Sequence, residues 1–359
     1  MIGNERKKIF VGVSGGVDSS VSLALLKDQG HDVVGVFIKT WQPDWLACTW
    51  KEERRDAMRV CAHLDVPFVE LDLEDAYKQG VADYMIAEYK KGRTPNPDVM
   101  CNREVKFGGF LSWARAQGAH AVATGHYAQS VYRDGAFHLL MGKDASKDQS
   151  YFLWTLTQDQ LAHILFPVGH LEKKEVRRLA EKYALPTATK KDSQGICFIG
   201  QVSMKDFLSH YIEHTPGNVL NEAGEVIGTH TGALFYTVGE RHGFTVTHKG
   251  THDAPYYVIA KDIANNTITV SHAQALSENI STHIVLSDVI MRTPVHNGDT
   301  YQGVIRYHGD MRTYTVHAYD PDTHRLVLVS DVLDRTRALG QSLVLYRDDV
   351  CVGGGIIEE

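Results

Sequence analysis

The sequence predicts an α/β fold that changes to antiparallel β structure toward its C-terminal end. Three observations carry this prediction. Strand and helix patterns alternate over the first 125 residues, short alternating runs replace them from about residue 205, and 359 residues exceed what one ordinary hydrophobic core supports. A parallel sheet covered by helices on both faces should therefore be followed by one or two smaller β domains.

The predicted elements of the first part follow one another in strict alternation. The strands are expected at 9–13, 33–38, 67–73 and 121–124, and the helices at 18–29, 51–64, 75–90 and 104–117. This alternation is typical of a doubly wound parallel sheet. Ligands in such folds bind beyond the carboxyl ends of the strands. The loop after residue 13, Ile38 and Gly125 are therefore expected to face one site.

The second part contains short alternating runs separated by Gly, Asn, Asp and Pro. They lie at 233–238, 256–260, 267–271, 300–307, 313–319 and 326–329. This pattern favours an antiparallel barrel or sandwich. Residues 171–183 form a basic amphipathic helix, whose charged face is either simply solvated or in contact with phosphate.

Composition limits the possible partners and surroundings of the chain. Its 37 basic and 44 acidic residues give a net charge of −7, so an RNA-binding site would have to be a local basic patch. No apolar run approaches membrane-spanning length, and the N-terminus does not resemble a signal peptide. The five cysteines include no Cys-x-x-Cys pair, which favours a reducing cytoplasm over a disulfide framework or a zinc knuckle.

The loop behind the first predicted strand is the most informative segment. Residues 14–20 read SGGVDSS and lead into an apolar helical pattern. Glycines allow close approach of a ligand, the start of a helix favours an anion, and Asp18 could hold Mg²⁺ beside phosphates. The string fits neither the Walker A motif nor the dinucleotide fingerprint. It resembles the SGGxDS loop of enzymes that split ATP into AMP and pyrophosphate, although an ordinary glycine-rich turn is the alternative.

Cys101 is a candidate nucleophile. It follows a loop stiffened by two prolines and lies near the start of a predicted helix, with Arg103 and Lys106 close by. Such surroundings lower the pKa of a thiol. Asp98, three residues earlier, could act as an acid, a base or an orienting group. A small buried side chain is the alternative reading of a lone cysteine.

Cys197 is the candidate partner of Cys101. It lies in the segment TKKDSQGICFIG, whose lysines, glycines and small polar residues indicate a positive loop that presents a thiol. Two such cysteines beside an ATP loop suggest sulfur chemistry, with one of them carrying a persulfide. Cys61 and Cys351 are expected to be packing residues, and the role of Cys48 stays open.

Two further segments could contact nucleic acid. Lys147 could bind a phosphate and Gln149 a base or ribose, unless this stretch is only an exposed turn that leads into a helix. Arg306 and Tyr307 could combine a phosphate contact with a stacking surface, although such a pair is usually an ordinary β surface.

Longer motifs extend the comparison over the whole chain. They read SGGVDSS, RTPNPDVMCN, ATGHYA, KDQSYFL, TATKKDSQGICFIG, YTVGERHG, IRYHGD and VCVGGGII. With them the chain resembles the bacterial MnmA family of tRNA-specific 2-thiouridylases. The resemblance implies a Rossmann-like ATP-pyrophosphatase domain at 1–204, a small central tRNA-binding domain at 205–275 and a C-terminal β-barrel at 276–359. The helical segment at 166–184 could join the central domain.

The resemblance also implies roles for individual residues. ATP would contact Gly12, Val13, Ser14, Gly15, Gly16, Val17, Asp18, Ser19, Ile38 and Gly125. The target base would lie among Asn96, Pro97 and Asp98, with Cys101 as the nucleophile and Cys197 as the persulfide carrier. The tRNA would touch His126, Lys147, Asp148, Gln149, Arg306, Tyr307 and Gln341. No resident metal site is expected, and Mg²⁺ would accompany ATP.

The implied reaction is ATP-dependent adenylation of O2 of wobble uridine 34, followed by sulfur transfer from a cysteine persulfide. The products would be 2-thiouridine, AMP, pyrophosphate and a Cys101–Cys197 disulfide that a reductant reopens. Expected partners are tRNAs of the Lys, Glu and Gln type and a persulfide donor, such as a cysteine desulfurase or a sulfur-relay protein.

Some positions depart from the family pattern. Glu240, His308 and Leu339 replace a common Gln, Arg and Pro, and the usual glycine-rich stretch after Glu240 reads FTVTH at 244–248. Two other functions stay open from the residues alone. One is a ligase that forms an amide or ureido bond with the same ATP loop, and the other is a tRNA-binding protein in which ATP only regulates docking.

Overall fold

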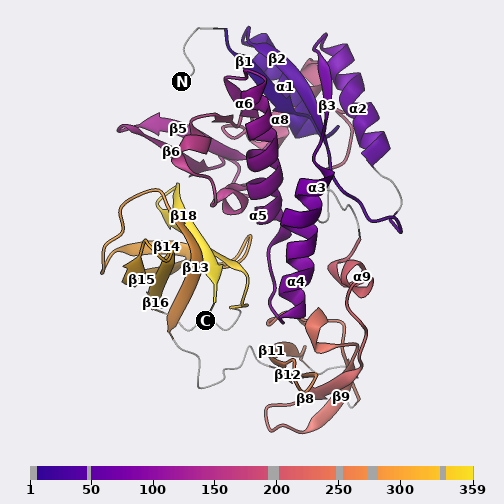
Figure 1. Cartoon of the computed structure of the whole chain (residues 1–359), viewed down its shortest axis with the longest axis vertical. Coiled ribbons are helices and arrows are strands. Elements are labelled where there is room, and N and C mark those ends of the chain that lie inside the picture. The colour runs from indigo at the N-terminus through magenta and orange to yellow at the C-terminus, as the bar shows by residue number, and fades with distance from the viewer. Residues whose placement is uncertain are drawn as a thin grey trace.

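The computed structural model describes residues 6–46, 50–192, 202–247, 254–272, 282–331 and 337–358. It contains a parallel sheet, a central antiparallel-rich sheet and a barrel sheet (Figure 1). The α/β fold class with a C-terminal barrel is therefore confirmed. Within the described ranges, no helix combines the length and the apolar character needed to cross a bilayer.

The parallel sheet has the order β3-β2-β1-β4-β7. Its strands are β1 (Lys8–Gly12), β2 (Asp32–Lys39), β3 (Phe68–Asp72), β4 (Ala121–Ala123) and β7 (Ile164–Leu165). The chain builds outward from β1 through β2 to β3 and then returns to the other side of β1 with β4. The gap between the paths of the chain after β1 and β4 is the switch point at which doubly wound folds bind ligands.

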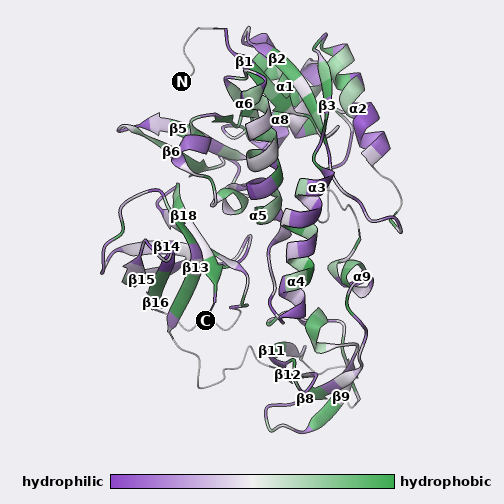
Figure 2. Ribbon diagram, in the orientation of Figure 1, coloured by the Kyte–Doolittle hydropathy of each residue, from purple (hydrophilic) through white to green (hydrophobic). Residues whose placement is uncertain are grey.

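Helices cover both faces of this sheet, because its central strands carry apolar side chains on both sides. Helices α1 (Val17–Asp28) and α2 (Trp50–His63) pack on the face that contains Ile9 and Val11. The opposite face, around Phe10, is covered by η2 (Cys101–Phe110) and α6 (Leu111–Ala116). Figure 2 shows the apolar strands between helices whose outer surfaces are polar.

Two predicted helices are longer or less regular than expected. The segment predicted at 75–90 consists of α3 (Glu74–Tyr77), the π-helical η1 (Lys78–Asp83) and α4 (Tyr84–Lys90). The segment predicted at 104–117 begins earlier, with α5 (Pro97–Met100), and continues through η2 and α6. Asn96 accepts hydrogen bonds from the backbone N–H groups of Asp98 and Val99, and Pro97 occupies the first helical position. Pro97, one of the two prolines of the loop before Cys101, therefore begins helix α5.

The central sheet has the order β10-β9-β8-β12-β11. Its strands are β8 (Gly217–Leu220), β9 (Val226–His230), β10 (Thr245–Val246), β11 (Tyr257–Asp262) and β12 (Thr267–Ser271). Helix α9 (Met204–Ser209) precedes it. The strand predicted at 233–238 is wrong, because residues 233–235 form the 3₁₀ helix η4 (Ala233–Phe235). Phe235 and Tyr236 are buried in succession, so the segment does not alternate as a strand would.

The barrel is a closed ring of antiparallel strands in the order β13-β16-β15-β14-β17-β18, because β13 also pairs with β18. The strands are β13 (His283–Met291), β14 (Thr300–Val304), β15 (Arg312–Asp320), β16 (Arg325–Ser330), β17 (Ser342–Arg347) and β18 (Val350–Ile357). Strand β14 ends at Val304, before the predicted limit of 307. The fully buried interior of the barrel contains Leu286, Leu326, Leu343 and Ile357.

A hairpin from the first half of the chain extends the barrel sheet. Strands β5 (Ala128–Arg133) and β6 (Ala136–Met141) pair with each other, and β6 pairs with β18 through Leu139 and Leu140. The sequence had not indicated these strands. The remaining short helices are η3 (Ser150–Leu153), α7 (Gln158–Leu161) and the longer α8 (Lys173–Lys182). Through its pairing with β18, the hairpin connects the barrel to the domain of the parallel sheet (Figure 1).

Candidate functional site

The glycine loop lies at the carboxyl end of β1 and leads into α1. Gly15 has a positive φ of 72°, and a Cβ there would lie 2.5 Å from the carbonyl oxygen of Glu53. Gly16 is the N-cap of α1 and has an ordinary extended backbone. A Cβ on Gly16 would meet only the Ser14 hydroxyl, at 3.3 Å. Gly15 is therefore required by the fold, whereas Gly16 leaves space beside the positive end of the helix.

Asp18 lies in the first turn of α1 and has two partners outside the loop. The Tyr127 hydroxyl donates a hydrogen bond of 2.8 Å to Oδ1. Lys173 Nζ lies 2.7 Å from Oδ1 and 2.8 Å from Oδ2. Burial and the Asp18 charge together raise the pKa of Tyr127, so this hydroxyl stays protonated and donates. The carboxylate is the type of ligand that Mg²⁺ uses beside phosphates, but Lys173 holds both of its oxygens here.

Gly125 and Ile38 come from the neighbouring strands. A Cβ on Gly125 would lie 2.6 Å from the backbone nitrogen of Ser19 and 2.8 Å from the carbonyl carbon of Asp18. The turn after β4 therefore lies directly against the start of α1. Ile38 lies on β2, next to β1, and is buried. The structure thus brings together the residues predicted for ATP, from Gly12 to Ser19 with Ile38 and Gly125, at one edge of the sheet.

A cluster of charges around Asp192 adjoins this edge. Its carboxylate lies 3.1 Å from Lys147 Nζ, 2.9 Å from Lys173 Nζ and 2.6 Å from Arg177. Burial alone would raise the pKa of Asp192, but the hydrogen bonds from Lys173 and Lys147 outweigh it and lower the pKa to about 2. Lys147, predicted to contact tRNA, is paired here with Asp192. Neither Asp192 nor the role of Lys173 beside Asp18 was recognised in the sequence.

Cys101 lies where α5 continues into η2, and its thiol is fully buried at 0% exposure. Asp98 is one turn earlier on the same helix. The Asn102 amide donates to the backbone oxygens of Asp98, at 3.0 Å, and Phe152, at 3.3 Å. Asn96 serves as the N-cap, and Pro97 is buried. The other predicted catalytic cysteine, Cys197, lies outside the described residues, as does Cys48.

Contacts connect the Cys101 helix to the glycine loop. Lys106 Nζ lies 3.4 Å from Nε2 of His126, whose Nδ1 lies 2.7 Å from the Thr124 hydroxyl. A Cβ on Gly12 would contact Phe110 at 3.5 Å. His126 is only 7% exposed, and burial, followed by the Lys106 charge, lowers its pKa well below the usual value. A neutral His126 therefore lies inside the junction between the two sites, although tRNA contact was predicted for it.

Asp148 and Gln149 are held by the surrounding backbone. Asp148 accepts hydrogen bonds from the N–H groups of Gly142, at 2.7 Å, and Ser150, at 3.1 Å, and its burial raises its pKa. Gln149 Oε1 accepts from the backbone N–H of Tyr127 at 3.0 Å. Both residues thus position the turn that carries Lys147. Their predicted contact with tRNA stays a prediction.

The barrel and the central sheet meet the segment before Cys101. Gln341 Nε2 donates to the Thr94 oxygen at 2.8 Å, and Arg93 makes two hydrogen bonds to the Glu358 carboxylate, of 2.7 and 2.8 Å. Arg306 donates to the Val238 oxygen at 2.8 Å. Elements of all three sheets therefore surround the start of the Cys101 helix.

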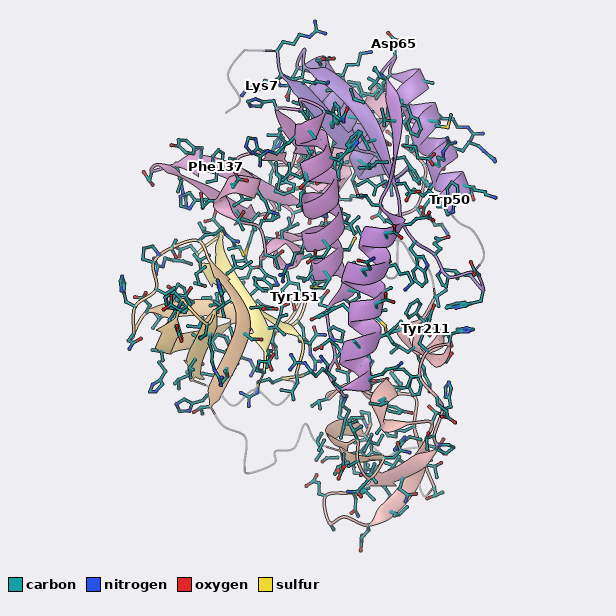
Figure 3. The ribbon with its side chains drawn as sticks, in the orientation of Figure 1. Lys7, Trp50, Asp65, Phe137, Tyr151 and Tyr211 are labelled. Atoms are coloured by element: carbon teal, nitrogen blue, oxygen red, sulfur yellow. The ribbon has the colours of Figure 1, made fainter. Side chains whose placement is uncertain are left out.

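Aromatic side chains line the same junction. Tyr307 is 37% exposed, and its ring centroid lies 4.6 Å from that of Phe152. Tyr151 is buried and donates to the backbone oxygen of Ser342 at 3.1 Å. Figure 3 shows Tyr151 between the barrel and the helices that lead to Cys101. An exposed ring beside the buried Tyr151 and the half-buried Phe152 is a suitable surface on which a base could stack.

Comparison with known proteins decides the family. The models of the "tRNA methyl transferase HUP domain", the "tRNA methyl transferase PRC-barrel domain" and the "Aminomethyltransferase beta-barrel domain" match residues 7–201, 205–272 and 285–357. A tRNA-specific 2-thiouridylase MnmA of Streptococcus agalactiae is 41% identical over 364 residues, which cover 100% of this chain and 97% of the relative. The chain belongs to the MnmA family.

A second curated relative agrees with this assignment. The MnmA protein of Geobacillus thermodenitrificans is 42% identical over 354 residues, or 98% of this chain and 95% of that protein. A solved U34-tRNA thiolase from Methanococcus maripaludis matches at a TM-score of 0.36 with 16% identity, over 57% of this chain and 64% of its own.

The departures from the MnmA pattern have visible surroundings. The backbone oxygen of Leu339 accepts a 2.7 Å hydrogen bond from the backbone N–H of Thr94, and Leu339 is 44% exposed. Because this contact uses only the backbone oxygen, it does not require a proline at position 339. Glu240 accepts from the backbone N–H of Thr237 at 3.0 Å, and burial raises its pKa. His308 has a positive φ of 58° and lies against the ring of Tyr307. These three departures thus adjoin the junction of the three sheets.

Proposed function

We propose that this MnmA-family chain adenylates O2 of wobble uridine 34 in tRNA and then replaces that oxygen with sulfur from a cysteine persulfide. The observation that carries the proposal is the junction of two sites. The glycine loop and the Cys101 helix meet at one edge of one sheet, because a Cβ on Gly12 would lie 3.5 Å from Phe110 and Lys106 contacts His126. ATP and the target base could therefore be held in neighbouring positions.

The glycine loop would bind the phosphates of ATP. The open space at Gly16 and the positive end of α1 suit an anion, and Ile38 and Gly125 border the same strand ends. Mg²⁺ would neutralise phosphate charge when bound, and Asp18 is the residue at the loop that could hold it. Lys173 would then have to release at least one Asp18 oxygen.

The uridine O2 would attack the α-phosphorus of ATP, and the bond to the bridging oxygen would break to release pyrophosphate. This step converts a poor leaving oxygen into AMP. The terminal sulfur of the Cys197 persulfide would attack C2 and expel AMP. The Cys101 thiolate would then attack the Cys197 sulfur, so that the S–S electron pair stays on the base as 2-thiouridine. The resulting Cys101–Cys197 disulfide needs a reductant.

The surroundings of Cys101 support its place in this sequence. Asp98 is one helical turn away and can accept the thiol proton. Since Cys101 is fully buried, the side chains above it must move when tRNA and the persulfide arrive. Asn96, Pro97 and Asp98 would surround the base, and Tyr307, Arg306 and Gln341 would contact the tRNA nearby.

The partners would be tRNAs of the Lys, Glu and Gln type and a persulfide donor, such as a cysteine desulfurase or a sulfur-relay protein. A reducing cytoplasm suits this reaction, because it supplies the reductant that reopens the disulfide after each turnover. The donor would load Cys197 before each turnover.

Mass spectrometry of nucleosides tests this function directly. The protein is incubated with these tRNAs, ATP and a persulfide source, and we expect 2-thiouridine together with equal amounts of AMP and pyrophosphate. The matched variants are Cys101→Ser and Cys197→Ser, compared with Cys61→Ser at a buried packing position. The first two should abolish thiolation, and the third should not. Pyrophosphate release with small amines but not with tRNA would instead identify a ligase, and tRNA binding without release would identify a binding protein.

A further inference from the structure

The 3₁₀ helix η3 lies between the Cys101 helix and the barrel. On one side, the Phe152 backbone oxygen accepts a 3.3 Å hydrogen bond from the Asn102 amide, which belongs to the Cys101 helix. On the other side, the centroid of the Phe152 ring lies 4.6 Å from that of Tyr307. A single residue of η3 therefore touches both the helix that carries Cys101 and the part of the barrel that carries Tyr307.

Tyr151, the preceding residue of η3, makes a second connection to the barrel. It is only 3% exposed. Its hydroxyl donates to the backbone oxygen of Ser342 at 3.1 Å and lies 3.4 Å from the backbone oxygen of Ile305. Ile305 directly precedes Arg306 and Tyr307, the barrel residues that are predicted to contact tRNA. The hydroxyl is therefore anchored on the segment from which the barrel would hold tRNA.

The same hydroxyl faces the start of the Cys101 helix. Burial raises the pKa of Tyr151, and a hydrogen bond from the Asn96 side chain opposes that rise, which places the amide N–H next to the phenol oxygen. Asn96 Oδ1 accepts from the backbone N–H groups of Asp98, at 3.1 Å, and Val99, at 3.2 Å, and thus caps α5. Polar contacts therefore connect the barrel, through Tyr151 and Asn96, to the first turn of the helix that leads to Cys101.

We propose that Tyr151 is a positioning residue, whose hydroxyl holds the barrel segment of Ile305 and Arg306 in place relative to the capped start of the Cys101 helix. This inference deepens the proposed function and depends on it. The tRNA would contact the barrel at Arg306 while its target base lies beside Asp98, so the uridine O2 reaches the α-phosphorus only if these two parts keep their spacing. A displacement of about 1 Å at the reacting groups can lower a rate about 100-fold. Tyr151 itself touches no reacting atom.

The competing explanation is that the Tyr151 hydroxyl only stabilises the fold. Its removal would then lower the free energy of unfolding, as for any buried hydrogen bond, without a specific effect on the reaction. Tyr346 offers a matched control, because it is a buried tyrosine of the barrel whose hydroxyl lies 3.1 Å from the Ser150 hydroxyl of η3. Within the described residues, the hydrogen bond of Tyr346 ends on η3 and does not reach Asn96.

The test measures the rate of a single turnover of thiolation by the full-length protein, with saturating ATP, tRNA and persulfide donor. The affinities for ATP and tRNA and the unfolding midpoint are measured for each variant. The variants are Tyr151→Phe, Asn96→Asp and the double variant, with Tyr346→Phe as the control. Asn96→Asp keeps the oxygen that caps the helix and removes the amide N–H that faces Tyr151. A double-mutant cycle then shows whether these two residues act as one unit.

We expect Tyr151→Phe to slow thiolation by about 10-fold or more and to leave the affinities for ATP and tRNA within about twofold of the parent. Added to Asn96→Asp, the same change should slow the reaction by less than about twofold, because the connection is already broken. Tyr346→Phe should lower the unfolding midpoint to a similar extent and leave the rate unchanged. Equal rates of Tyr151→Phe and Tyr346→Phe, or an equal loss with and without Asn96→Asp, would overturn the inference alone. A parent protein that forms no 2-thiouridine would overturn the proposed function and the inference with it.

Discussion

At the scale of single residues, the two central glycines of the loop have different tasks. Gly15 adopts a left-handed backbone against the Glu53 oxygen, whereas Gly16 has an extended backbone with space beside it. The sequence motif did not distinguish them, because the distinction depends on where α2 lies. The structure therefore indicates which glycine can be replaced without disturbing the fold.

Gly16→Val is expected to abolish ATP binding in a folded protein, because the branched side chain would occupy the space where phosphate must lie. Gly15→Ala is the contrasting variant, and its positive φ and its clash with Glu53 should lower stability by about 1–3 kcal/mol. Calorimetry with ATP and thermal unfolding measure the two effects. Normal ATP affinity in folded Gly16→Val would show that the phosphates bind elsewhere.

Asp192 makes a contribution to stability that depends on pH. Its pKa in the folded protein is about 2, below the usual value of 3.8, so its ion pairs stabilise the fold fully above that usual value. The stabilisation is lost as the pH falls through the folded pKa. After allowance for solvent screening, it amounts to about 1 kcal/mol.

The difference in unfolding free energy between the parent and Asp192→Asn should therefore be constant from pH 7 to about pH 5 and shrink toward pH 2. Denaturant titrations at several pH values measure it. A difference that grows as the pH falls would contradict the ion-pair account.

At the scale of elements, strands β1 to β4 of the parallel sheet and the helices between them could be predicted, because each carries its own apolar pattern. Strand β7 of the same sheet was not predicted, because its two residues are too few to show such a pattern. The hairpin of β5 and β6 could not be predicted either, since β6 obtains its partner β18 from a segment more than 200 residues later in the chain. The strand predicted at 233–238 was wrong because burial there also depends on tertiary packing. Its apolar residues are buried by the packing of η4, and not by a sheet face.

The barrel is attached to the Cys101 loop by Arg93, which pairs with Glu358 through two hydrogen bonds. Arg93→Met should lower the free energy of unfolding by about 1–3 kcal/mol, because the Glu358 carboxylate of the barrel and the buried Glu88 carboxylate, 2.6 Å from Arg93 Nε, both lose a charged partner. Arg115→Met, at an exposed ion pair with Asp159, is the control and should have almost no effect. Thermal unfolding compares them. Equal midpoints for the two variants would remove Arg93 from the connections that hold the domains together.

At the scale of the whole molecule, the candidate site is assembled from segments that are distant in sequence. The sequence motifs indicated the glycine loop and Cys101 because each is a continuous string. Lys173 was recognised only as part of a basic helix, because its contact with Asp18 spans 155 residues and forms only when α8 packs on α1. Short motifs therefore predicted the chemical groups of the candidate site better than the long-range contacts that bring those groups together.

The net charge of −7 implies that tRNA binding depends on local groups of cations. Lys147→Ala should weaken binding and reduce the slope of log affinity against log salt by about one. Lys143→Ala, in the same turn and paired with Glu175, is the control and should leave the slope unchanged. Filter binding at several salt concentrations measures both. An unchanged slope in Lys147→Ala would exclude this residue from the phosphate contacts.

The fate of the uridine oxygen tests the central claim most directly. A tRNA is prepared with ¹⁸O at O2 of uridine 34 and is incubated with the protein, ATP and a persulfide source, and the AMP formed is analysed by mass spectrometry. If O2 is adenylated and then displaced by sulfur, each 2-thiouridine formed must be accompanied by one AMP that carries ¹⁸O. AMP without the label, formed alongside 2-thiouridine, would contradict adenylation of the base.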